Sequence, residues 1–350
     1  MLCQRAVVVA GDAQLKMYGL LCIVILVVAF AVASNAQDVP PRPIYTIDLS
    51  SLVPQDTTSF QGTVAFLGNQ TLAVSICGKV GCNLATFDYA DGKIRQIAQV
   101  HEVEHSRSIL RASDGGVLLT AVRRGKENGV VHFSSDLRSS QWTPTVPGVS
   151  TAGEKIPNGN GRLLAHSAIA AAYLDQGIVR IQGMDGRLLG SFVAGIPSDK
   201  FIPAALFLGS DRLWFQRSGT PEIRDFNGKV LLKLDKPDGW GGRMGKSDDG
   251  TRLMYNRFTR HVGLAQTIME GALVLPTMGM STDGDVPNGE MVSVIDTESG
   301  KRCFEWNGKE KLLPIGGYHA DIDPSGRLVA IMTQGSLAIY RLPDSCSGRE

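Results

Sequence analysis

The sequence predicts an all-β protein: a β-propeller of about six four-stranded blades, closed by an N-terminal strand in the last blade. Three observations support this prediction. Short apolar runs alternate with glycine turns, the runs recur in similar groups, and the last group lacks one strand that the N-terminus can supply. Glycine accounts for 40 residues and apolar residues for 43% of the chain. Abundant glycine between short apolar runs is typical of tight turns between strands.

The last repeat, residues 319–342, reads HADIDPSGRLVAIMTQGSLAIYRL and contains three short strands. Near the N-terminus, residues 44–49 form a strand pattern with no hairpin partner nearby. If this strand completes the last blade, the ring closes without an exposed edge. The alternative is seven blades, with the seventh near residues 150–165 or 259–290.

Degenerate copies of the same unit fill the chain between these two ends. The outer-turn glycines Gly92, Gly186 and Gly228 are about 94 and about 42 residues apart, which fits one blade every 42–47 residues or so. The strands predicted for the five units before the last are 63–67, 71–76, 84–89 and 94–100; 117–122 and 130–133; 168–174, 178–182 and 187–193; 204–208, 212–216, 222–226 and 229–234; and 251–256, 291–296 and 301–306.

Three turns connect these repeats with a known class: DPSGR from Asp323, SDDG from Ser247 and DTESGK from Asp296. Over about residues 44–342 the chain resembles the broad class of bacterial exported propellers related to WD40 and YVTN-type repeats. The resemblance implies the fold. It does not imply a chemistry, because such propellers serve as binding platforms and some are enzymes.

The first 36 residues have the pattern of an export signal. Arg5 and Lys16 precede an apolar run over residues 20–33, and small residues follow at 34–36. The run of about 14 residues is shorter than the ~20 needed to span a bilayer as a helix. We therefore expect cleavage after Ala36, a Pro-rich linker at 37–43, a propeller at 44–350, and a periplasmic or extracellular location. The alternative is a membrane anchor formed by an uncleaved N-terminal segment.

Charge limits the classes of partner. The chain has 35 basic and 34 acidic residues; without residues 1–36, which contain two basic residues and one acidic residue, the net charge is zero. Nucleic-acid binding normally needs a basic excess that displaces counterions. We therefore expect no nucleic-acid partner and no membrane contact after cleavage. The expected partner is an unidentified protein or small-molecule ligand, bound by a monomer.

Four cysteines remain outside the predicted signal: Cys77, Cys82, Cys303 and Cys346. An even number in an exported chain indicates disulfides. Cys77 and Cys82 flank a predicted hairpin tip and can face each other across it, so Cys303 and Cys346 would pair by elimination. The alternative is four free or buried thiols.

Two clusters of polar residues contain side chains of the types that bind metal ions. The sequence HEVEH, from His101 to His105, matches a zinc-binding pattern that requires a helix. In a strand the two histidines lie ~13 Å apart, and the repeat places this stretch at an outer strand, so we interpret it as a connection between strands. We interpret Asp321 and Asp323, near His319, as residues that cap their own turn. The sequence thus predicts no metal site and no cofactor.

The most unusual segment is an insertion at about residues 259–290. It is apolar and methionine-rich, a composition that adapts to varied partners. We expect it to form a lid or partner surface, with Met269, Leu273, Met278 and Met280 as the contact residues; the alternative is a structural plug.

The functional prediction is an exported binding or interaction module without an identifiable catalytic motif. The alternative function is a propeller enzyme, hydrolase or lactonase-like, with its site in the central channel.

Overall fold

The computed structural model describes residues 41–55, 61–68, 70–79, 81–101, 103–112, 114–123, 128–144, 162–167, 169–194, 203–216, 220–234, 244–257, 268–269, 272–273, 291–307, 319–333 and 335–346. Residues Arg42–Glu350 form one compact unit. The predicted signal segment, residues 1–36, lies outside the described residues.

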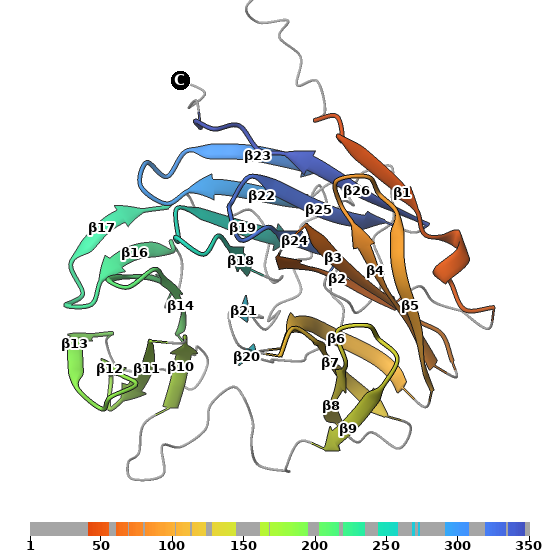
Figure 1. The fold of residues 1–350 in the computed structure, drawn as a ribbon. Coiled ribbons are helices and arrows are strands. Elements are labelled where there is room, and N and C mark those ends of the chain that lie inside the picture. Colours follow the sequence, from red (N-terminus) through yellow and green to blue (C-terminus); the bar gives the residue numbers. More distant parts are fainter. Residues whose placement is uncertain are drawn as a thin grey trace, which may run out of the picture. The chain divides into compact units, whose positions relative to one another are not determined.

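The described part of this unit contains six four-stranded antiparallel sheets, which we call blades 1–6, and one two-stranded hairpin (Figure 1). Blade 1 contains β2 (Gln61–Gly68), β3 (Thr71–Cys77), β4 (Gly81–Asp88) and β5 (Ile94–His101); blade 2 contains β6 (Val103–Arg111), β7 (Val117–Arg123), β8 (Asn128–Phe133) and β9 (Ser140–Pro144); blade 3 contains β10 (Arg162–His166), β11 (Ala170–Asp175), β12 (Ile178–Gly183) and β13 (Leu188–Val193). Blade 4 contains β14 (Ala204–Leu208), β15 (Arg212–Gln216), β16 (Glu222–Asp225) and β17 (Val230–Lys233); blade 5 contains β18 (Met244–Lys246), β19 (Arg252–Arg257), β22 (Met291–Asp296) and β23 (Arg302–Asn307); blade 6 contains β24 (Ala320–Ile322), β25 (Leu328–Thr333), β26 (Ser336–Arg341) and β1 (Tyr45–Asp48).

Blade 6 confirms the predicted closure. Its strand order is β1-β26-β25-β24, and β1 pairs antiparallel with β26, with Thr46 opposite Ala338 and Ile47 opposite Leu337. Figure 1 shows the red N-terminal strand beside the blue C-terminal one. A short 3₁₀ helix, η1 (Ser50–Leu52), follows β1 and buries Leu52. The two ends of the propeller sequence therefore share one sheet, which covers the edge that β26 would otherwise expose.

The predicted Asn-Gly and Asp-Gly turns form as the sequence indicates. Gly228 has a φ of +85°, which residues with a side chain rarely adopt. A Cβ there would also lie 2.2 Å from Cβ of Phe192 in blade 3. The Asp225 carboxylate accepts hydrogen bonds of 2.9 Å from the backbone N–H groups of Asn227 and Lys229. This turn thus needs glycine for both its conformation and its packing on the neighbouring blade.

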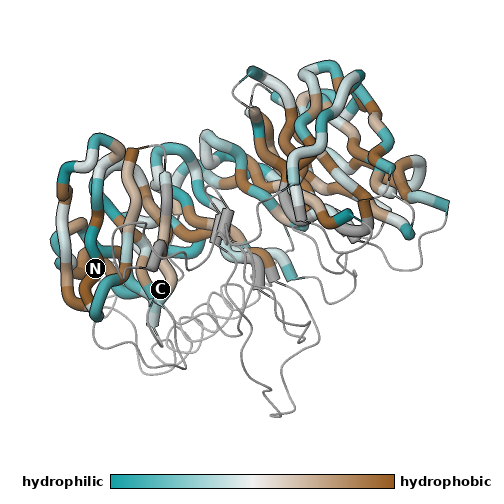
Figure 2. The backbone as a smooth tube through the Cα atoms, turned by 90° about the horizontal axis from the view of Figure 1, so that it is seen from below, coloured by the Kyte–Doolittle hydropathy of each residue, from teal (hydrophilic) through white to brown (hydrophobic). Residues whose placement is uncertain are grey.

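The cores lie between blades. Successive side chains of a strand point to opposite faces of the sheet, so apolar residues reach both faces. Figure 2 shows hydrophobic residues concentrated in the strands and hydrophilic ones at the turns. Among the described residues, apolar clusters join blades 1 and 2, 3 and 4, 4 and 5, 5 and 6, and 6 and 1. Trp214 of blade 4 is fully buried, and its indole N–H donates a 2.7 Å hydrogen bond to the Tyr255 hydroxyl of blade 5.

Four strands were not predicted as strands: β6 and β9 of blade 2, β10 of blade 3 and β18 of blade 5. The last two are short inner strands and show why. β10 follows a Gly-rich stretch, and β18 has only three residues, Met-Gly-Lys. Neither has enough residues for an alternating pattern to stand out. Both form because each has a long antiparallel partner: β10 pairs with β11 and β18 with β19. They complete the four-stranded sheets of blades 3 and 5.

The insertion contributes one short hairpin to the described structure. β20 (Ile268–Met269) pairs antiparallel with β21 (Ala272–Leu273), and β21 lies near β14 and β18. These two neighbours are the first strands of blades 4 and 5. The rest of the insertion, including Met278 and Met280, lies outside the described residues.

The described residues of the HEVEH stretch belong to two strands, β5 and β6. His101 ends β5 and is exposed, whereas Val103, at the start of β6, is buried. The helical spacing that would bring both histidines to one metal ion is therefore not formed. The segment is the connection between blades 1 and 2, as the repeat predicted.

Candidate interaction surface

The two faces of blade 3 differ sharply. One face packs against blade 4: Val179, Ile181 and Phe192 are buried there, together with Phe207 and Phe215 of blade 4. The Phe192 and Phe215 rings meet edge to face, with centroids 5.3 Å apart, an arrangement that aromatic pairs favour. This face therefore belongs to the core between blades.

The opposite face carries side chains that remain open to solvent; we call it the open face. Its rows follow the strand register: Tyr173, Arg180 and Ser191 lie side by side, next to a row of Asp175, Ile178 and Val193. Val193 is 74% exposed and Leu188, at the other end of β13, is 56% exposed. An exposed apolar patch rimmed by polar residues is a feature of surfaces that bind a partner, and these two side chains share their face with the polar Arg180 and Ser191.

A β-bulge gives Leu188 its exposure. The register of β12 and β13 shifts between Ile181 and Gln182, so that Gln182 lies opposite Leu188. Leu189, the extra residue, packs against the core shared with blade 4. Bulges redirect side chains in this way, and here the bulge directs Leu188 to the open face.

Two further exposed apolar residues, Ile169 and Met184, lie in adjoining turns at one end of blade 3. Ile169 is 48% exposed and Met184 is 62% exposed, and the Met184 N–H donates a 3.1 Å hydrogen bond to the Ile169 carbonyl. The β12–β13 turn is held by Asp185, whose carboxylate accepts a 3.0 Å hydrogen bond from the Arg187 N–H. These contacts fix the turn, so the exposed side chains project from a defined backbone.

No apolar cluster joins blades 2 and 3 within the described residues, unlike the other five neighbouring pairs. Blade 2 buries Ile109, Leu119 and Phe133 against blade 1. Of the two faces of blade 3, one packs in the core shared with blade 4. The open face has no such core within the described part of the chain.

The acidic residues of the last repeat have structural roles. The Asp323 carboxylate accepts hydrogen bonds from the backbone N–H groups of Arg327 and Leu328, at 2.7 and 2.6 Å, which confirms the predicted cap of its own turn. The buried Asp321 accepts a 2.8 Å hydrogen bond from the Phe66 N–H of blade 1. Asp321 therefore links the last blade to the first, a role that the predicted cap of its own turn did not include. No group of three or more metal-ligating side chains occurs among the described residues.

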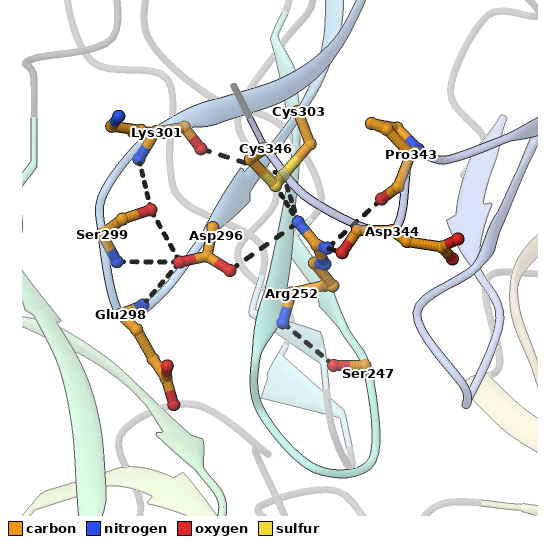
Figure 3. Close-up of a disulfide and its surroundings, with 10 residues drawn as sticks. All are labelled: Ser247, Arg252, Asp296, Glu298, Ser299, Lys301, Cys303, Pro343, Asp344 and Cys346. Atoms are coloured by element: carbon orange, nitrogen blue, oxygen red, sulfur yellow. Dashed lines mark hydrogen bonds and ion pairs between the residues drawn. A yellow bond between two sulfur atoms is a disulfide. The ribbon is translucent and has the colours of Figure 1, made fainter. Parts of the chain in front are cut away.

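Both predicted cysteine pairs lie at disulfide distance. The sulfur atoms of Cys77 and Cys82 are 2.01 Å apart, across the β3–β4 hairpin, and those of Cys303 and Cys346 are 1.89 Å apart. The second pair connects β23 of blade 5 with the segment that follows β26 (Figure 3). Two such pairs fit an oxidising environment.

The described part of the predicted lid lies beside blades 4 and 5. Met269 and Leu273 belong to the β20–β21 hairpin beside blades 4 and 5, whereas the exposed apolar residues lie on blade 3. Sequence reasoning missed Leu188 and Val193 because the pattern of residues 187–193 predicts a strand but does not show which of its side chains stay uncovered. No helix in the described residues is long and apolar enough to cross a membrane.

No family model matches the sequence, and no curated protein matches it. Raptor from Chaetomium thermophilum is similar in structure, with a TM-score of 0.54 at 10% identity; the match covers 87% of this chain and 29% of the Raptor chain. The chain thus spans less than a third of that protein. The C-terminal WD40 domain of Sif2 matches with a TM-score of 0.44 at 13% identity, over 81% of this chain and 82% of that one. The Cps50 (Swd1) β-propeller domain from Myceliophteria thermophila matches with a TM-score of 0.37 at 12% identity, over 87% and 100%. Six four-stranded sheets, closed by β1 and similar in fold to part of the Raptor structure, show that this chain has a β-propeller fold.

Proposed function

We propose that this protein is an exported binding module that takes a protein partner on the open face of blade 3. The observation that carries the proposal is the exposure of Leu188 and Val193, on a sheet whose other face is a normal core. A partner that covers these side chains removes apolar surface from water, at roughly 25 cal/mol per Å². Arg180 is exposed on β12, between the residues that lie opposite Val193 and Leu188. Its charge can fix the partner's orientation.

The mixed character of this face supports a protein partner over a small molecule. Small ligands are usually held in concave pockets that enclose most of their surface. Protein partners instead cover broad surfaces in which apolar anchors are surrounded by polar groups. Leu188 and Val193, with Arg180 and Gln182 exposed beside them, match the second arrangement.

Site-specific photo-cross-linking tests this proposal in the cells that naturally produce the protein. A photoreactive phenylalanine analogue at position 193 is expected to form one dominant adduct with another protein. The same analogue at Ile97 is the control, because Ile97 is 54% exposed on β5 of blade 1, close to the 56% of Leu188. Leu188→Glu should abolish the adduct formed from position 193. Equal adducts from positions 193 and 97, or no adduct at 193, would rule out the open face as the docking surface.

We further propose that the insertion at residues 259–290 serves as a lid or second contact surface. The proximity of β21 to the first strands of blades 4 and 5 supports this role. Hydrogen exchange provides the test. The lid proposal expects the insertion to exchange faster than the blade strands and to gain protection when the cross-linked partner is bound. Protection equal to that of the blades, unchanged by the partner, would mean a structural plug.

Export is part of the proposal, with residues 1–36 removed and the mature protein in the periplasm or outside the cell. The apolar run before Ala36 and the two cysteine pairs support it. N-terminal sequencing of the protein from the exported fraction should begin at Gln37. A membrane-bound protein that retains residues 1–36 would instead indicate an uncleaved anchor.

A further inference from the structure

The two disulfides have very different surroundings. Cys77 and Cys82 are 1% and 0% exposed, in the core between blades 1 and 2. Ser106 Oγ lies 3.3 Å from Cys77 Sγ. Within the described residues, no cationic side chain forms a hydrogen bond with either sulfur. Cys303 and Cys346 are only half-buried. An external thiol can therefore reach the second pair far more easily than the first.

A guanidinium group lies directly against the second pair (Figure 3). Nη1 of Arg252 contacts both Cys303 Sγ and Cys346 Sγ. A cation at this position stabilises a thiolate over a thiol, which lowers the pKa of a cysteine released there. Because a thiol of lower pKa is the better leaving group, the cation also speeds exchange at the disulfide.

The position of this guanidinium is fixed by the fold. Arg252 is 9% exposed, and its Nη2 donates to the carbonyl groups of Asp344 and Pro343, at 2.9 and 3.3 Å. Its backbone N–H donates to Ser247 Oγ at 3.0 Å. The cation therefore stays at the disulfide instead of moving into solvent, and it binds the C-terminal segment that the disulfide also holds.

Asp296 moderates this charge. Its Oδ2 lies 3.7 Å from Arg252 Nη1. Burial raises the pKa of the Asp296 carboxyl, but hydrogen bonds from Ser299 and Glu298 and the nearby guanidinium outweigh it and hold that pKa below its ordinary value. The carboxylate is thus ionised at neutral pH and offsets part of the positive charge, which makes Asp296 a second position where the charge at the disulfide can be changed.

We propose that Cys303–Cys346 is a thiol–disulfide exchange site, activated by Arg252, that a dithiol reductant opens to release the C-terminal segment after β26. A thiolate of the dithiol attacks one sulfur and forms a mixed disulfide, and the other cysteine leaves as a thiolate beside Nη1, which reaches either sulfur. The second thiol of the dithiol then attacks the mixed disulfide and releases the second cysteine. The dithiol is oxidised to its disulfide, and the protein gains two electrons and two protons as cysteine thiols.

The fold confines the effect of reduction to the C-terminal segment. The ring is closed by backbone hydrogen bonds between β1 and β26, and neither strand contains a cysteine. Blades 5 and 6 also share an apolar core that the disulfide does not form. Reduction therefore removes the covalent hold on the segment at residues 344–346 and leaves it only the hydrogen bonds from Arg252, while the propeller remains folded.

The test uses the oxidised full-length protein, limiting dithiothreitol, rapid alkylation and peptide mass spectrometry, with Cys77–Cys82 as the internal reference. We expect Cys303–Cys346 to be reduced at least about tenfold faster than the reference pair, and hydrogen exchange in β26 to stay unchanged. Arg252→Met should slow its reduction about three- to tenfold, whereas Arg252→Lys, which keeps the charge, should stay closer to the parent rate.

Asp296→Asn is the matched variant that leaves the arginine in place, and it should speed the reduction of Cys303–Cys346. It also decides the outcome if Arg252→Met does not fold. A folded Arg252→Met variant that is reduced at the parent rate, or an Asp296→Asn variant with no change, would overturn the proposal. In that case accessibility alone would account for any difference between the two disulfides.

Discussion

Replacing Trp214 with alanine is expected to lower the free energy of unfolding by about 3–5 kcal/mol. Trp214 is the largest fully buried side chain in the described structure, and it lies in the core between blades 4 and 5. The truncation removes its packing and its 2.7 Å hydrogen bond to Tyr255. Urea denaturation followed by circular dichroism measures the loss. Trp214→Phe, which keeps a ring but not the N–H, should lose less.

Trp142→Ala is the control for this prediction. Trp142 is only half-buried, on β9 at the outer edge of blade 2, with the Arg123 guanidinium 4.2 Å from its ring centroid. Truncating Trp142 should lower the free energy of unfolding clearly less than truncating Trp214, because water already reaches part of the Trp142 ring. Equal losses for the two alanine variants would mean that the interface between blades 4 and 5 does not stabilise the ring as described.

Ile47→Asp is expected to destabilise the protein by at least about 3 kcal/mol, because it removes a buried aliphatic side chain and places a carboxylate in an apolar core. Ile47 is 7% exposed and packs in the cluster that joins blades 6 and 1. The carboxylate has no partner there, so β1 should detach and expose the edge of β26. Urea denaturation gives the loss of stability, and hydrogen exchange at β26 reports the detachment.

Thr46→Asp provides the matched control in the same strand. Thr46 is exposed and directly precedes Ile47. Because successive side chains of a strand point to opposite faces of the sheet, Thr46 lies on the other face. Its carboxylate would remain in water and should change stability by no more than about 0.5 kcal/mol. A similar loss for both variants would show that the strand tolerates neither charge, and the burial of Ile47 would not be the cause.

Most of the fold could be predicted from the sequence because turns and alternation are local properties. The Asn227–Gly228 and Asp185–Gly186 turns need positive φ, and the structure gives both glycines that conformation. The closure by β1 followed from counting, since one strand lacked a partner and one blade lacked a strand. β18 escaped prediction because three residues, one of them glycine, take their strand conformation from the pairing with β19.

The candidate surfaces were much less predictable. Leu188 and Val193 have the same pattern as core strand residues, and only the arrangement of blades shows that no described core covers them. Sequence reasoning found Cys303 and Cys346 by elimination, but it could not find Arg252. That residue is 51 and 94 positions away from the two cysteines, and such long-range contacts leave no local signal in one sequence.

Circular closure is the claim on which this description rests, and an engineered cross-link tests it most directly. Thr46 and Ala338 lie opposite each other in the β1–β26 pairing, so Thr46→Cys with Ala338→Cys should form a disulfide in high yield under mild oxidation. Peptide mass spectrometry identifies the link, and Thr46→Cys with Ser336→Cys, two residues out of register, is the control. The account predicts efficient linkage of 46 to 338 and little of 46 to 336. No linkage of 46 to 338, or equal linkage in both variants, would contradict it.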